Sequence, residues 1–143
     1  MTTLNATQAV EVIKSKFSHV GQTARVPKLR GGFFSAQLID SGIEVSNLGN
    51  QPFLPWGVFE ETVNPLLRNG GRAQRGNAMG PRLGERSLPL NSIEGHIAHT
   101  VYGKNLGESV FRRITPIACI LIWADVCKAG RGELIVQEQI GNG

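Results

Sequence analysis

The feature that most constrains the fold is a run of almost uninterrupted apolar residues near the C-terminus. Residues 116–127 read PIACILIWADVC, and Asp125 is the only clearly polar side chain among them. A helix that is apolar on all sides has to be covered by the protein core or by another subunit. We therefore expect the apolar helix from Pro116 to Cys127 to be buried, either inside the domain or at a homodimer interface.

The residues that flank this helix predict its start and a strand after it. Thr115 has a good N-cap side chain, and a proline is well tolerated at the first helical position. Gly130 and Gly132 end the segment, and residues 133–140, ELIVQEQI, then predict a C-terminal edge strand. We expect Cys119 and Cys127 to be small buried apolar residues rather than partners in a disulfide or ligands of a metal.

The N-terminal third predicts a helix followed by a hairpin. From about residue 6 to residue 19 apolar residues recur at three-and-four spacing, and Asn5 with Gln8 has the form of a capping box. Pro27 and a pair of glycines predict a basic loop over residues 22–32. Apolar and polar residues then alternate on both sides of residues 40–42, which predicts a β-hairpin with one buried side.

A second apolar stripe predicts a helix between Pro55 and Asn69. Pro65 lies inside this stripe, and an interior proline removes one hydrogen bond and crowds the carbonyl four residues earlier, at a cost of about 3 kcal/mol. We therefore expect a kink near Glu61 or a break at Asn64.

Together these segments predict a single compact α+β domain over residues 1–143. Its expected parts are an N-terminal helix, a β-hairpin, central helices with a long basic loop, the buried apolar helix and the edge strand. A chain of this length can bury about two thirds of the surface that its unfolded form exposes. The longest unbroken apolar run is eight residues, where a membrane span needs about twenty. We expect no membrane association and a cytoplasmic location.

The positive charge of the chain is concentrated in one third of its length. Between residues 68 and 113 there are eight basic and three acidic residues, whereas the rest holds seven basic and eight acidic ones. Residues 68–86, RNGGRAQRGNAMGPRLGER, contain five arginines and five glycines and show no periodicity. Arginine suits bidentate phosphate contact, and glycines let backbone amides approach the same anion. This predicts a long basic loop that contacts nucleic acid, with the candidate residues Arg68, Arg72, Arg75, Arg82, Arg86, Lys104, Arg112 and Arg113.

The segment after this loop has weak features of a helix-turn-helix. Asn91 and Glu94 have capping-box spacing before a short apolar-striped helix that Gly103 ends, and Arg112 and Arg113 come where a recognition helix could begin. The connection is too long for the strict motif, and Pro116 leaves the second helix only about eight residues. A looser winged arrangement, with the two arginines on a strand or turn, is the alternative.

Signals for catalysis and cofactors are weak. His96 and His99, with the carboxylate of Glu94 close by, could face one metal. However, the metalloprotease pattern has histidines four residues apart with glutamate directly after the first, and no clear third ligand is apparent. No phosphate-binding P-loop, dinucleotide fingerprint or nucleophile elbow occurs. We expect no cofactor and no metal, and lean against an enzyme.

The leading interpretation is a small nucleic-acid-binding protein. DNA is favoured over RNA because few aromatic residues are interleaved with the basic ones to stack on bases. The alternative is a homo-oligomeric interaction protein, or a protein that binds a small anionic ligand under the basic loop without catalysis. A third possibility is hydrolase or metal-dependent chemistry at Glu94, His96 and His99.

Overall fold

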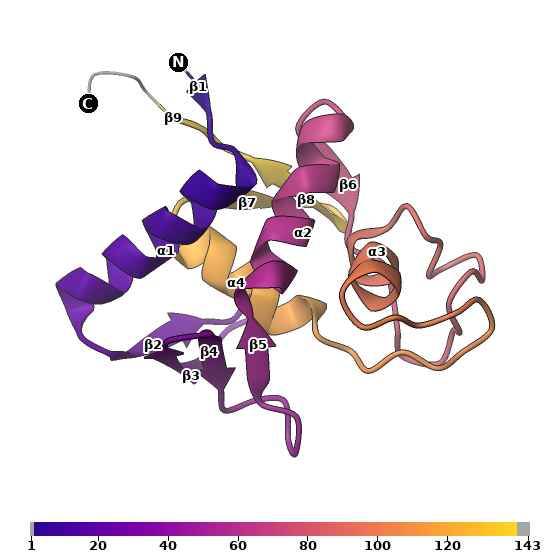
Figure 1. Cartoon of the computed structure of the whole chain (residues 1–143), viewed down its shortest axis with the longest axis horizontal. Helices are drawn as coiled ribbons and strands as arrows, with labels where there is room; N and C mark the ends of the chain where they lie inside the picture. The colour runs from indigo at the N-terminus through magenta and orange to yellow at the C-terminus, as the bar shows by residue number, and fades with distance from the viewer. Residues whose placement is uncertain (1, 140–143) are drawn as a thin grey trace.

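Two antiparallel sheets lie on opposite sides of a helical layer in this α+β protein (Figure 1). The computed structural model describes residues 2–139. The helices in this range are α1 (Ala6–Val20), α2 (Trp56–Arg68), α3 (Ile93–Thr100) and α4 (Ile114–Trp123). One sheet has the strand order β2-β3-β4-β5, formed by Thr23–Pro27, Phe33–Ile39, Gly42–Val45 and Phe53–Pro55. The other has the order β6-β8-β7, formed by Arg72–Gln74, Glu133–Val136 and Cys127–Gly130.

The two ends of the described chain lie side by side. β1 (Thr2–Thr3) pairs with β9 (Glu138–Gln139) in a short antiparallel ladder. No helix in the described range is long and apolar enough to span a membrane. These elements confirm the single α+β domain that the sequence predicts.

Helix α1 confirms the expected capping box. The Asn5 side chain accepts a hydrogen bond from the Gln8 amide at 2.8 Å, and the Gln8 side chain accepts one from the Asn5 amide at 2.9 Å. The apolar stripe faces the core, and Phe17 packs edge-on against Trp123 of α4 with ring centroids 5.0 Å apart. This contact joins the first and last helices directly.

The hairpin at residues 40–42 is also confirmed, but the expected loop over residues 22–32 is wrong for its first half. Residues Thr23–Pro27 form β2, in which Ala24 and Val26 point into the core and their neighbours into solvent. Pro27 is compatible with this strand because β2 lies at the sheet edge and the proline is its last residue. Only the tight turn after it remains irregular, closed by the bond from the Lys28 amide to the Gly32 carbonyl at 2.9 Å.

Helix α2 runs through Pro65, so the expected break at Asn64 is wrong. The helix continues to Arg68, and Pro65 is itself buried between the fully covered Val63 and Leu66. Burial of this apolar face offsets the missing backbone hydrogen bond. Pro55 precedes the helix as its N-cap residue.

Helix α4 lies in the middle of the domain. Residues 117–121 are each at most 1% exposed, and the helix contacts strands of both sheets. Because its own chain covers α4, the apolar run no longer indicates a subunit interface. Cys119 and Cys127 are free and buried, and burial raises the pKa of the Cys127 thiol to about 12.

The ends of α4 differ from those expected. The helix begins at Ile114, before the expected first residue Pro116, and it ends at Trp123, before Cys127. Its N-cap residue is Arg113, so the capping role predicted for Thr115 is wrong and Thr115 lies within the first turn.

The C-terminal strand has two neighbours instead of one. β8 lies between β6 and β7, so the segment Glu133–Val136 is not an edge strand. Its partner β6 comes from the arginine-glycine stretch, where we expected only a loop. The chain then continues into β9, and Ile140, the last residue of the predicted strand, lies outside the described residues.

The segment between β6 and α4 forms a loop-rich region on one side of the molecule, around α3 (Figure 1). We call residues 75–113 the α3 region. It has a small apolar cluster of its own, separate from the main core, formed by Leu83, Leu88, Ala98 and Val110. Helix α3 begins after Ser92, whose hydroxyl accepts from the Gly95 amide at 3.1 Å, so the capping role predicted for Asn91 is wrong.

Candidate anion-binding site

A pocket of about 840 Å³ opens where the α3 region meets the two sheets. Cationic residues from four separate segments line it: Lys28 and Arg30 from the β2–β3 turn, Arg75 after β6, Arg112 before α4, and Arg131 from the β7–β8 turn. We call this the basic pocket. This convergence of charge makes the pocket the strongest candidate for a functional site in the described part of the chain.

Neutral hydrogen-bonding groups complete the wall of the basic pocket. The polar residues Gln74, Asn77, Ser87 and Thr115 line it, together with three glycines, Gly31, Gly76 and Gly132. All three glycines have positive φ, which other residues rarely adopt. At such turns the backbone can come close to a bound anion.

Glu133 is the one acidic residue among those that line the basic pocket. It accepts hydrogen bonds from both Nε and Nη2 of Arg72, which lies outside the lining. The hydrogen bonds from Arg72 hold the pKa of the Glu133 carboxyl below its usual value. With this acid already paired, the five lining cations give the pocket a strong net positive charge.

Two of the eight predicted contact residues, Arg75 and Arg112, lie in the basic pocket. Arg72 lies at its edge as the partner of Glu133.

Arg82 and Arg113, two other predicted contact residues, instead make contacts within the fold. The Arg82 guanidinium donates to the Gly107 carbonyl at 3.3 Å. Arg113 is only 8% exposed, packs on the rings of Tyr102 and Phe111, and donates to Gln51 at 2.8 Å. The others, Arg68, Arg86 and Lys104, do not line the pocket.

Sequence reasoning missed three of the five pocket cations, Lys28, Arg30 and Arg131. Each lies in or beside a short turn that contains glycine, between strands that pair in the folded protein. The signal was present in the sequence as basic residues within three positions of a glycine. It became specific only once the pairing of β2 with β3 and of β7 with β8 brought these turns to one place.

The helix-turn-helix interpretation is wrong. Residues 109–113, where a recognition helix would begin, have no helical structure. The next helix, α4, is buried in the core and cannot enter a DNA groove. Arg112 is instead held by its neighbour Met79, whose sulfur accepts a hydrogen bond from the guanidinium at 2.8 Å.

The carboxylate of Glu94 is buried beside the basic pocket. It accepts hydrogen bonds from the backbone amides of Arg113 at 3.0 Å and Ile114 at 3.1 Å, and its residue is 1% exposed. Burial raises the pKa of Glu94 to about 7, and the two amide bonds only partly oppose that effect. Glu94 therefore points toward the start of α4 and away from any shared site with the histidines.

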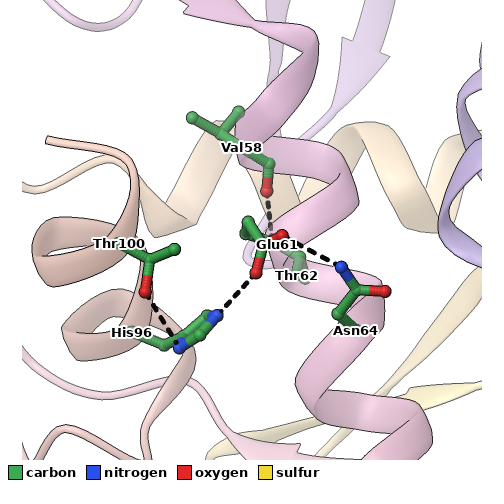
Figure 2. Close-up of polar contacts among 6 residues, drawn as sticks. All are labelled: Val58, Glu61, Thr62, Asn64, His96 and Thr100. Atoms are coloured by element: carbon green, nitrogen blue, oxygen red, sulfur yellow. Dashed lines mark hydrogen bonds and ion pairs between the residues drawn. The ribbon is translucent and has the colours of Figure 1, made fainter.

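His96 pairs with Glu61 across the contact between α3 and α2 (Figure 2). Its Nε2 lies 2.8 Å from Glu61 Oε1, and its Nδ1 lies 3.4 Å from the Thr100 hydroxyl. Burial acts to raise the pKa of Glu61, but hydrogen bonds from His96 and Asn64 bring it below its usual value. His99 contacts the Lys104 carbonyl instead. The suggested Glu94, His96 and His99 metal group does not come together, and no cluster of three such ligands occurs among residues 2–139.

The chain was compared with protein-family models, curated proteins and solved structures, and none of the three comparisons gave a match.

Proposed function

We propose that this protein binds nucleic acid through the basic pocket, with duplex DNA as the first candidate. The observation that carries the proposal is the convergence of five cations from four segments on one pocket, around a single acid that is already paired. Cations that gather in a concave site repel one another and attract anions to it, so such a convergence is typical of an anion site. The planar guanidinium of arginine binds phosphate through paired hydrogen bonds.

The lining favours the phosphates of a polymer over a drug-like ligand. Small-molecule pockets are predominantly apolar and aromatic, with a few polar groups. Here six charged and four polar residues line the pocket, beside four apolar ones: Leu29, Met79, Ile114 and Ala118. Long cationic side chains at a concave surface suit the nucleic-acid backbone, which supplies most of the affinity in non-specific binding.

The absence of aromatic side chains among the described lining residues favours duplex over single strand. Proteins that bind single strands stack the bases on aromatic rings, and the basic pocket offers none. Binding through phosphates alone should therefore be weakly dependent on base sequence. A homodimer through α4 is not part of the proposal, because the chain itself covers that helix.

A small anionic ligand is the second candidate. It is favoured by the pocket volume of about 840 Å³, which falls within the range of about 300–1,000 Å³ typical of ligand sites. Inorganic phosphate, pyrophosphate and nucleotides are suitable probes. A rise in melting temperature with one of them, without any binding to duplex DNA, would favour this candidate.

The test is fluorescence polarisation of a labelled DNA duplex over a series of salt concentrations. If all five pocket cations meet phosphates, the slope of log affinity against log salt should be about −4.5. The triple variant Arg75→Ala, Arg112→Ala, Arg131→Ala should lose most of the affinity and flatten the slope by about 3. The proposal fails if the wild type shows no salt-dependent binding.

A matched control separates the pocket from net charge. Arg68→Ala, Arg82→Ala, Arg86→Ala removes the same charge from the predicted stretch but outside the lining. This triple variant should keep most of the affinity. Equal losses in both variants would show that diffuse charge is responsible and not the pocket.

A further inference from the structure

Glu94 does not line the basic pocket, but it contacts two of the segments that form it. It lies in the first turn of α3 and is 1% exposed. A buried carboxylate is costly unless it has specific partners. Its contacts therefore indicate what it does for the fold around it.

The carboxylate of Glu94 joins α3 to the start of α4. Helix α4 has no side-chain cap of its own, because its N-cap residue is Arg113. Oε1 of Glu94 supplies this cap by accepting from the amides of Arg113 and Ile114. The residues on either side of the capped amides, Arg112 and Thr115, both line the basic pocket.

The backbone at Glu94 joins α3 to the opposite wall. Its amide donates to the Arg75 carbonyl at 2.9 Å. Gly76 lies so close that a Cβ there would come within 2.6 Å of the Ser92 hydroxyl and 3.3 Å of Glu94 Cβ. Arg75 and Gly76 line the pocket, so one residue contacts both walls.

We propose that Glu94 is a positioning residue of the basic pocket. By capping α4 while its backbone holds the Arg75 wall, it sets where the Arg112 guanidinium stands relative to that of Arg75. This inference rests on the proposed function, since it concerns the affinity of the same site for phosphate.

Whether removal of Glu94 weakens or strengthens ligand binding separates a positioning role from a purely electrostatic one. A carboxylate near an anion site repels the ligand, so its removal by charge alone should strengthen binding. Loss of a positioning group should weaken binding although the protein becomes more positive. The charged groups that act on Glu94 in the native state are Arg113 and Arg112, and its charge in turn acts on the Tyr102 hydroxyl.

The test uses the labelled duplex and three variants. Glu94→Ala should weaken binding about tenfold, because the start of α4 beside Arg112 loses the acceptor that holds its amides. Glu94→Gln keeps an acceptor oxygen for the two amides and should bind close to wild type. Glu85→Ala removes an exposed carboxylate from the same region and should not weaken binding. A folded Glu94→Ala variant that binds as well as wild type, or better, would overturn the inference.

A double-mutant cycle tests whether Glu94 acts through Arg112. In the Arg112→Ala background, Glu94→Ala should have little further effect on affinity, because the group that it positions is gone. In the Arg82→Ala background the two effects should add, since Arg82 lies outside the pocket. Additive effects with Arg112→Ala would contradict the positioning role.

Hydrogen exchange distinguishes failure of this inference from failure of the proposed function. In Glu94→Ala the amides of Arg113 and Ile114 should exchange faster than in wild type, whether or not any ligand binds. Unchanged exchange overturns the inference alone, whereas absence of wild-type binding to both duplex and inorganic phosphate overturns the proposed function. Should Glu94→Ala fail to fold, Glu94→Asp, with its shorter reach, takes its place and should show the same two changes in weaker form.

Discussion

The main core and the α3 region are built in different ways. In the main core, helices and strands bury long apolar stripes against one another, and residues such as Ile13, Phe59 and Ile120 are fully covered. In the α3 region outside helix α3, isolated backbone hydrogen bonds between loop segments take the place of regular ladders. For example, the Asn77 amide donates to the Ser87 carbonyl at 2.9 Å. The basic pocket takes cations from both regions and lies at the boundary between them.

The largest expected effect is a loss of stability from a substitution in the main core. Phe59→Ala should lower the free energy of unfolding by about 3–5 kcal/mol, because a fully buried ring is replaced by a cavity. Chemical denaturation followed by circular dichroism measures this loss. Phe53→Ala, at a ring that is 38% exposed, is the control and should cost clearly less. Similar losses at both positions would contradict the assignment of this core.

The next effect is a pH dependence from the α3 region. The pKa of Glu94 is about 7 in the folded protein and near its ordinary value of 4.5 when unfolded. The folded state therefore holds the proton more tightly, and this contribution is complete below pH 4.5 and lost as the pH rises through 7. The loss should reach about 3 kcal/mol.

Glu94→Gln removes this titration. The difference in stability between the variant and the wild type should therefore grow in favour of the variant from pH 5 to pH 8, measured by denaturation at matched ionic strength. A difference that stays constant over this interval would show that Glu94 does not titrate there.

A smaller loss is expected in the small apolar cluster. Leu88 is fully buried there, and Leu88→Ala should cost about 2 kcal/mol, at the low end for leucine because few neighbours surround it. Hydrogen exchange should rise mainly within residues 75–113 and much less in α1 and α2. Equal acceleration throughout the chain would show that the two regions unfold as one unit.

The difference between the main core and the α3 region explains how much of the structure could be predicted from the sequence. Periodicity and capping predicted α1, the hairpin and the burial of α4, because those elements depend on the spacing of apolar residues. The same patterns failed at β2 and β6, which are short and are stabilised by partners elsewhere in the chain. Of the arginines in the arginine-rich stretch, only Arg75 lines the basic pocket. The membership of Lys28 and Arg131 in the pocket depends on tertiary pairing that no local pattern reports.

The smallest effect compares two glycines of the α3 region. Both Gly76 and Gly80 have positive φ, at 85° and 105°, so alanine is strained at either position. Only at Gly76 does the added methyl group meet a neighbour, the Ser92 side chain, whereas Gly80 has open space. Gly76→Ala should therefore cost about 1 kcal/mol more than Gly80→Ala in denaturation, which is the cost of overpacking beyond the shared backbone strain. It should also weaken binding of the DNA duplex, because Gly76 forms part of the pocket wall beside Arg75. Equal stability and equal binding in the two variants would mean that the close approach of Gly76 to α3 does not hold that wall in place.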